Sequence, residues 1–396
     1  MSEKIPLNPV LLKWARETIG YSVEDVVEKI KRKSITSLVV EGWEDGTLSP
    51  SYPQLEMLAY TVYKRPLAIF FFPEPPEEKT PEQSFRTLPR EEINLMGPSL
   101  LYLIRRARVM QENLYELYEG ENPAKHKICA DINLEEYLSV PEAAMVVRKY
   151  LGADLEKQYA MKRDEEALGY WRNLLEDHGV FVFKDAFDDD ECSGFCLDDK
   201  VFPIIYVNNS QPKVRQIFTL FHELAHLLFK TGGVDLRHDD FVQRIEGKNR
   251  DIEIFCNQFA GEFLVPTSDI QRFLSGKRIE ETLISELAKK YCVSREVILR
   301  KCLDLEYVSQ TLYESKVKEW ETQRVKRPPA GANKALYYPM RVAYLGERYI
   351  ETAFRKYYKG LISKLQLAEF LDVKERNISR LEDHLLRRSS NREVYF

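Results

Sequence analysis

Apolar residues recur at helical spacing along most of the chain, and this pattern predicts a mainly helical protein. Helices are expected within residues 8–72 (five short ones), 98–118, 140–151, 164–178, 251–264 and 336–388. Three short runs rich in β-branched and aromatic residues, 180–184, 193–197 and 202–207, have polar turns between them and predict strands. The expected fold class is mainly α with a small β-sheet (α+β).

The most apolar of the expected helices, Phe218 to Phe229, contains the sequence His222-Glu223-x-x-His226. Helical spacing places the two histidines one turn apart on the same face. Two imidazoles at this spacing can bind one Zn²⁺, and Glu223 then lies beside the metal, where it can take a proton from water. Ionisable groups on a buried helix are costly unless something binds them, which favours a metal site over a chance match among six histidines.

A catalytic zinc site needs a third protein ligand and an open position. The downstream candidates are His238, Asp239, Asp240, Glu246, Asp251, Glu253 and Glu262. Glu253 lies on the amphipathic helix expected over 251–264. Asn257 is one turn further on, where it could accept a hydrogen bond from a ligand histidine; a surface Glu and Asn pair is the alternative. Tyr206 and His238, the latter in a polar loop over 231–248, are candidates to stabilise an oxyanion, but spacing places neither.

The cysteines indicate a reducing environment. Six Cys in 396 residues do not form a disulfide framework, and the N-terminus has no signal-peptide layout. No membrane span is expected near it, so the protein is expected to be cytoplasmic. Cys192 and Cys196 alone are weak evidence for a metal site. Cys256 lies three residues after Glu253; as a fourth ligand it would close the site and prevent hydrolysis.

Length and composition indicate a globular protein of several domains, with 44% apolar and 31% charged residues. The expected boundaries are 1–72 (helix-turn-helix domain), 73–130 (Pro-rich linker and long helix), 131–313 (metal-binding domain), 314–335 (linker) and 336–396 (helical C-terminal domain). The net charge of −5 gives no global basic signature, so contact with nucleic acid would need a local patch.

Short helices joined by tight turns in the first 72 residues fit a helix-turn-helix domain. The candidate nucleic-acid contacts precede or belong to its third helix, expected over 34–45; they are Lys31, Arg32, Lys33, Ser34, Thr36 and Ser37. Phosphates would be repelled by Glu41, Glu44 and Asp45, and residues 1–72 hold nine Lys and Arg against nine Asp and Glu. Double-stranded DNA and a protein partner therefore both remain open. Two other helix pairs, 283–303 and 362–381, have a similar pattern and are interpreted first as packing units.

Two motifs resemble the ImmA/IrrE metallopeptidase family: Arg215-Gln216-Ile217-Phe218-Thr219-Leu220-x-His222-Glu223-Leu224-x-His226, and Glu253-x-x-Cys256-Asn257-x-Phe259-Ala260. The family usually has Ala at the position of Cys256 and Glu at that of Phe255. The N-terminal sequence Trp43-Glu44-x-Gly46 is similar to Cro/XRE-type domains. The resemblance implies a zincin-like (gluzincin-type) zinc site formed by His222, His226 and Glu253, with Glu223 as general base.

Two hypotheses about function follow. The first is a zinc-dependent endopeptidase coupled to transcription regulation, because the resemblance implies cleavage of a repressor-type protein. The second is a DNA-binding regulator or toxin–antitoxin component whose zinc domain is a sensor or a structural core. A homodimer is compatible with either hypothesis, and the sequence does not identify the substrate.

Overall fold

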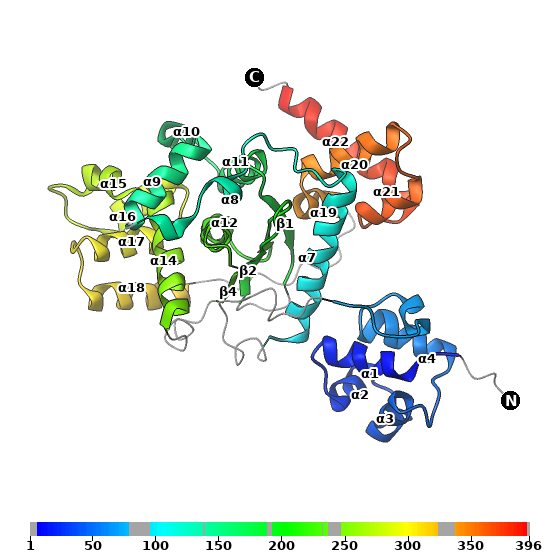
Figure 1. Ribbon diagram of the computed structural model, residues 1–396. Coiled ribbons are helices and arrows are strands. Elements are labelled where there is room, and N and C mark those ends of the chain that lie inside the picture. Colours follow the sequence, from blue (N-terminus) through cyan, green and yellow to red (C-terminus); the bar gives the residue numbers. More distant parts are fainter. Residues whose placement is uncertain are drawn as a thin grey trace. The chain divides into compact units, whose positions relative to one another are not determined.

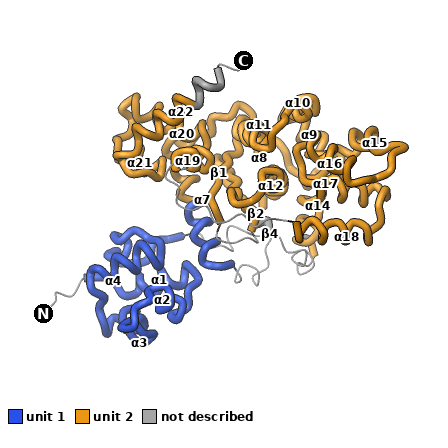
Figure 2. Tube along the Cα trace, turned by 180° about the vertical axis from the view of Figure 1, so that it is seen from behind, with its two compact units in different colours: residues 1–106 blue, residues 107–396 orange. Residues whose placement is uncertain are grey.

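A computed structural model describes residues 6–78, 96–137, 139–187, 192–231, 233–236, 247–323 and 337–393. The fold is mainly helical with one small sheet, which confirms the predicted class (Figure 1). The chain forms two compact units, residues 1–106 and 107–396 (Figure 2). None of the described helices has both the length and the apolar character needed to cross a bilayer.

Unit 1 consists of short helices around a small core that includes Leu11, Val26, Val40 and Leu55. The elements are α1 (Pro9–Thr18), α2 (Val23–Ile30), α3 (Ser37–Glu44), α4 (Tyr52–Glu56), the π-helix η1 (Met57–Val62) and the 3₁₀ helix η2 (Leu67–Phe71). Ser22 and Asp25 form a capping box that starts α2. The third helix begins three residues later than predicted, because Lys31 ends α2 in a left-handed conformation and residues 31–36 form the turn.

Unit 2 contains the sheet and most of the helices, and α7 (Pro98–Leu117) runs into it from unit 1. Its first half has α8 (Ile128–Asp131), η3 (Leu134–Glu136), α9 (Val140–Leu151), α10 (Leu155–Ala160), α11 (Asp164–Asp177), β1 (Phe181–Asp185), β2 (Cys192–Leu197), β3 (Ile204–Asn208), α12 (Lys213–Leu228) and β4 (Gly233–Leu236). Its second half has α14 (Gly247–Leu264), α15 (Thr267–Leu274), α16 (Glu281–Tyr291), α17 (Arg295–Asp304), α18 (Gln310–Thr322), α19 (Tyr337–Leu345), α20 (Glu347–Tyr358), α21 (Lys364–Phe370), η5 (Glu375–Asn377) and α22 (Ile378–Glu393).

The four described strands lie in the order β1-β3-β2-β4. β1 and β3 are parallel, whereas β2 is antiparallel to both β3 and β4. Three of these strands match the predicted runs within about two residues, a normal boundary error. β4 was not predicted: it occupies part of the segment 231–248 that was expected to be a loop.

The two faces of the sheet pack against different helices. Ile205 and Val207 of β3 belong to the core that includes α12, and side chains alternate along a strand, so Tyr206 points to the opposite face. On that opposite face, Phe181 contacts Tyr118 near the end of α7, with ring centroids 5.6 Å apart. Figure 1 shows the sheet between α12 and α7. This arrangement leaves α12 buried between the sheet and the helices α11 and α14.

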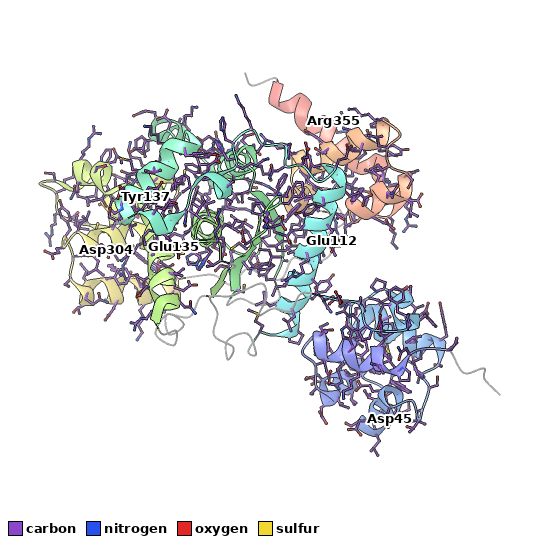
Figure 3. The ribbon with its side chains drawn as sticks, viewed as in Figure 1. Asp45, Glu112, Glu135, Tyr137, Asp304 and Arg355 are labelled. Carbon is purple, nitrogen blue, oxygen red and sulfur yellow. The ribbon has the colours of Figure 1, made fainter. Side chains whose placement is uncertain are left out.

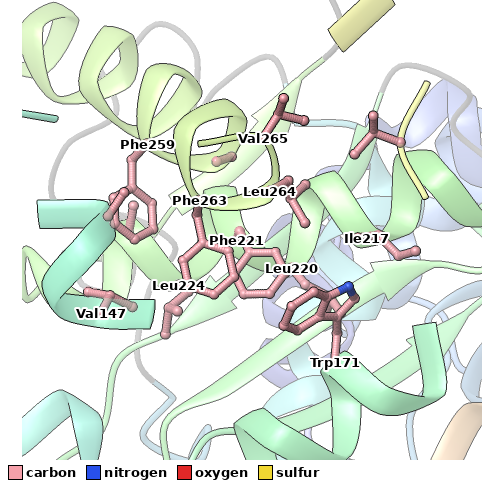
Figure 4. Packing of buried hydrophobic residues seen from close by; sticks show 14 of the residues in the cluster. Val147, Trp171, Ile217, Leu220, Phe221, Leu224, Phe259, Phe263, Leu264 and Val265 are labelled. Carbon is pink, nitrogen blue, oxygen red and sulfur yellow. The ribbon is translucent and has the colours of Figure 1, made fainter. Parts of the chain in front are cut away.

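Helix α14 is fixed against α12 by aromatic packing and by polar side chains at its C-terminal end. The rings of Phe221 and Phe263 are stacked with centroids 4.0 Å apart (Figure 4). The last carbonyls of a helix have no partner within the helix. Here Arg148 of α9 donates to the carbonyl of Phe263, and Gln158 Nε2 donates to that of Leu264 at 2.9 Å. The face of α14 that meets α12 is thereby held in place.

The C-terminal part differs from the prediction in two ways. A linker was expected from residue 314, and this prediction is wrong up to Thr322 because α18 occupies 310–322. Trp320 of this helix is buried, and its indole N–H donates to Glu281 at 3.2 Å. Residues 324–336 lie outside the described part, as do residues 79–95 of the expected Pro-rich linker. The C-terminal helices belong to unit 2, where Arg172 of α11 donates to the carbonyl of Ala343 at 2.9 Å.

Candidate metal centre

The two histidines of the motif lie in the last two turns of α12, a helix buried over most of its length. Gln216, near its start, donates through Nε2 to the carbonyl of Gln211 at 2.7 Å and ties the helix to the segment after β3. From Thr219 to Leu228 every residue is buried. Glycine at position 194 of β2 allows this close approach, since a Cβ there would lie 2.6 Å from Thr219 Cγ2.

Three side chains from two helices converge at one point. His222 and His226 of α12 have their Nε2 atoms 3.2 Å apart. Glu253 of α14 places Oε1 3.2 Å from His226 Nε2 and Oε2 3.5 Å from His222 Nε2. All three residues are buried, and in the described part of the chain they are the one group of His, Cys, Asp and Glu whose ligand atoms cluster closely enough to hold a metal.

These separations can be compared with the size of a zinc site. Zn–N and Zn–O bonds of about 2.0–2.2 Å at tetrahedral angles place neighbouring ligand atoms roughly 3.2–3.5 Å apart. The three measured separations are 3.2, 3.2 and 3.5 Å. The two separations to Glu253 involve different oxygens of its carboxylate, so they match the size of a zinc site without defining one tetrahedral corner. The donor set of two imidazoles and one carboxylate fits such a metal.

The segment after α12 supports His226 from the side away from the other ligands. The hydroxyl of Thr231 lies 3.4 Å from His226 Nδ1 and donates to the backbone carbonyl of His226 at 3.0 Å. When Nδ1–H donates to this hydroxyl, the lone pair of the ring is on Nε2, the atom that faces His222 and Glu253. Thr231 thus has the orienting role that was expected of Asn257.

Gly233, the first residue of β4, lies against two side chains of the motif. A Cβ at this position would be 2.4 Å from His226 Cδ2 and 2.9 Å from Glu223 Oε2. No other residue type fits without displacing the ring or the carboxylate. Sequence reasoning missed this residue, although the pair Gly232-Gly233 directly after the apolar helix was a usable signal.

Two buried thiols flank the centre. Burial raises the pKa of Cys196 on β2 well above its ordinary value, and its interaction and hydrogen bond with Glu223 add to this. Its sulfur also accepts from the backbone N–H of Gly233 at 3.2 Å. Burial likewise raises the pKa of Cys256 on α14 to about 11. All six cysteines are free and buried, and neither flanking thiol belongs to the group that can hold a metal.

The same contacts affect the charge of His226. Burial lowers the pKa of this imidazole, but the neighbouring Cys256 and the carboxylate of Glu253 outweigh burial, so the pKa lies well above its ordinary value. The neighbouring carboxylate thus favours the protonated ring, and a metal that binds Nε2 would have to displace this proton.

Three predicted site residues do not join this cluster. Tyr206 points to the other face of the sheet, where its ring stacks on Phe195 with centroids 5.2 Å apart, so it is not an oxyanion donor at this centre. The prediction was wrong because the alternation of β3 becomes known only once α12 is placed on one face. Asn257 is exposed on α14, and no hydrogen bond of the described chain joins it to either histidine. His238 lies outside the described residues.

Comparison with known families agrees with this geometry. Residues 175–303 match the model of the IrrE N-terminal-like domain, Peptidase_M78. The match covers β1 to β4 and both helices that carry the clustered side chains. It supports a function of the metallopeptidase type for this part of the chain. No curated protein matches the chain.

The candidate nucleic-acid contacts lie in unit 1. Lys31, Arg32, Lys33 and Ser34 are exposed in the turn between α2 and α3; Thr36 is the residue before α3, and Ser37 is the first residue of that helix.

Of the three acids in unit 1 that were expected to repel phosphate, Glu44 and Asp45 are bound by neighbouring side chains. Glu44 forms a two-bond ion pair with Arg16, at 2.7 and 2.9 Å. Asp45, on the outer side of unit 1 (Figure 3), accepts hydrogen bonds from Thr47 that lower its pKa. The ion pair with Arg16 weakens the expected repulsion of phosphate at Glu44, whereas Asp45 keeps its full negative charge.

Proposed function

We propose that this protein is a zinc-dependent endopeptidase that cleaves a specific protein and is coupled to transcription regulation. The observation that carries the proposal is the buried group of His222, His226 and Glu253, with Glu223 on the same helix as the two histidines. The match of this region to a peptidase family model agrees with it.

Each residue has a defined task in this proposal. His222 and His226 bind the metal through Nε2, and Glu253 binds it through its carboxylate. When bound, Zn²⁺ acts as a Lewis acid and makes water a better nucleophile at neutral pH. Glu223 accepts the proton of the attacking water and returns it to the leaving amine nitrogen. The Cys196 thiol forms a hydrogen bond with the Glu223 carboxylate, and the lack of a side chain at Gly233 leaves room for that carboxylate.

An extended peptide is the substrate that the sheet favours. β4 is the last strand in the order of the described sheet, and it starts at Gly233, against His226 and Glu223. A peptide that added to its outer edge would form main-chain hydrogen bonds and lie beside the metal ligands. This arrangement suits cleavage within a chain more than hydrolysis of a small molecule.

The coupling to transcription rests on unit 1. Its helices α2 and α3, with an exposed basic turn between them, are suited to bind double-stranded DNA or a repressor-type regulator. We propose that the cleaved protein is such a regulator, and that the reaction takes place in the cytoplasm.

Comparison of newly formed protein N-termini tests this function. The full chain is added to an extract of its own cells, with and without a zinc chelator, and N-terminal peptides are identified by mass spectrometry. The proposal expects a few new termini within one or two regulatory proteins, lost with the chelator and regained when Zn²⁺ is restored. An unchanged set of termini, with zinc shown to be bound, would contradict it.

A further inference from the structure

The C-terminal helices form a second helix-turn-helix, and we propose that it binds double-stranded DNA through the N-terminal half of α22. This inference is independent of the metal centre and of the basic turn in unit 1. Its residues lie outside the segment that matches the peptidase model, which ends at residue 303. Figures 1 and 2 both place α20, α21 and α22 together at one end of unit 2.

The turn between the two helices has the geometry that this motif requires. α21 ends at Phe370, and Asp372 adopts a left-handed conformation with φ of 47°. A residue of this kind ends one helix and redirects the chain, and Asp tolerates the conformation better than most non-glycine residues. The Asp372 carboxylate is held by Arg341 of α19, which fixes the turn.

The two helices are joined through η5, which contacts both of them, while α21 packs on α20 and α22 packs on α19. Ser363 and Gln366 form a capping box at the start of α21. The buried residues on the pair recur at the spacing of two crossing helices; they are Leu367, Ala368, Leu371, Ile378 and Leu381. Ile350 and Phe354 of α20, the helix that α21 packs against, are buried as well. Such a pair holds its second helix rigidly with the other face outward.

The outward face is continuous and polar. The exposed residues just before α22 and in its first two turns are Lys374, Glu375, Arg376, Ser379, Arg380 and Asp383. Arg376 and Arg380 are one turn apart and lie on the same side. In proteins that read the major groove, residues at the N-terminal end of the second helix contact the base edges.

The charge of this region favours DNA over an acidic or apolar partner. Residues 337–396 hold 12 Lys and Arg against 8 Asp and Glu, a net charge of +4, whereas the whole chain carries −5. Two of the acids are engaged: Asp372 with Arg341, and Glu382 with the hydroxyl of Tyr358. The exposed face itself has three cations and two acids, so we expect moderate affinity with some base preference, because carboxylates select cytosine N4.

A protein partner is the competing occupant. Leu361 and Leu365, beside and on α21, are exposed by 59% and 56% and would serve such a partner. They lie at the other helix of the pair, so the two occupants depend on different side chains.

Fluorescence anisotropy with a labelled duplex of mixed sequence tests the proposal in the full chain. To remove the contribution of unit 1, all proteins carry Lys31→Ala and Lys33→Ala. The added pair Arg376→Ala and Arg380→Ala should lower the affinity about tenfold or more, and each arginine that contacts a phosphate rather than a base edge should reduce the salt slope by about 1 when it is removed. The control pair Arg272→Ala and Arg278→Ala removes the same charge from side chains that are 78% and 90% exposed, and should change neither quantity.

Several results would overturn the proposal. Equal affinities of the two pairs of variants would assign the binding to overall charge, and absence of duplex binding at low salt would exclude DNA. Unchanged duplex binding in the Arg376→Ala and Arg380→Ala pair, together with loss of self-association in a Leu361→Ser and Leu365→Ser variant, would assign the pair to a protein contact. Equal midpoints of thermal unfolding in all variants exclude misfolding as the cause.

Discussion

At the scale of single residues, the candidate metal centre depends on Gly233, which has no side chain. Replacing Gly233 by Ala introduces a Cβ 2.4 Å from the ring of His226. The ring or β4 must move, and displacement of a group that supports a ligand costs about tenfold to a hundredfold in metal affinity. Competition with a chromogenic zinc chelator measures this affinity.

The control for Gly233→Ala is Gly261→Ala on α14, where an added Cβ meets no atom within 4 Å. Alanine there favours the helix, so zinc affinity should not change and stability should rise by about 0.5–1 kcal/mol. Equal zinc affinity in the two variants would show that the contact with His226 has no importance.

Cys256 provides a second test at this scale. It neighbours His226 but does not belong to the group of ligand atoms, so Cys256→Ala should retain one zinc per chain. Loss of zinc comparable with that of His226→Ala, measured by elemental analysis, would instead indicate a closed site with four protein ligands.

Sequence reasoning found residues whose role depends on spacing within one helix, and missed those whose role depends on packing between elements. His222 and His226 follow from a four-residue spacing. The periodicity of its own helix made Glu253 a candidate, and the resemblance to the ImmA/IrrE family singled it out. Thr231 contacts His226 only because the chain folds back after α12. Tyr206 was misassigned because a strand pattern does not say which face meets the helix.

At the scale of elements, the stacking of α14 on α12 holds the third ligand in place. Phe263→Ala removes a fully buried ring that lies 4.0 Å from the ring of Phe221, and should reduce the free energy of unfolding by about 3–5 kcal/mol. Ile254→Ala, on the same helix at a side chain that is 36% exposed, should cost less than about 1 kcal/mol. Urea unfolding measures the free energy of unfolding of both variants. Equal losses would show that burial of the Phe263 ring is not the cause.

A buried lysine on β1 should make stability depend on pH. Burial lowers the pKa of Lys184 well below 10.5, and nearby Arg172 and Lys213 lower it further. Between its folded pKa and 10.5 the unfolded chain binds more protons, so stability rises with pH over this window. Below the folded pKa, Lys184 is protonated in both the folded and the unfolded chain, and the full free-energy cost of burying its charge remains.

Lys184→Met should therefore raise stability near neutral pH by about 1 kcal/mol or more, with the gain shrinking toward pH 10.5. Thermal unfolding at several pH values measures this, with Lys127→Met at an exposed position as the control. A variant less stable than the parent at neutral pH would show that the ammonium group is held by favourable contacts.

Long periodic elements were predicted well from the sequence. α9 spans Val140–Leu151 as expected, because Ser139 caps its start and Gly152 ends it. β4 was missed because its four residues, Gly233–Leu236, are too few for their alternation to stand out, begin with a glycine and lie in a largely polar segment. α18 was taken for a linker because it is highly charged and has one buried residue, Trp320.

At the scale of the whole molecule, the chain has two compact units, one of which carries the metal centre and the C-terminal helices. Composition indicated several domains but did not predict that the C-terminal helices belong with the sheet. That association includes the bond from Arg172 to the carbonyl of Ala343, 171 positions away in sequence, and the edge-on contact of the Phe183 and Tyr349 rings, and no local pattern encodes such contacts.

The central claim is that Glu223 is the base of a zinc peptidase whose metal is held by other residues. The most direct test is to compare the parent protein with Glu223→Gln for both zinc content and cleavage of the protein substrate. The account predicts one zinc per chain in both proteins and loss of cleavage in the variant. Cleavage at the parental rate by a zinc-loaded Glu223→Gln protein would contradict it.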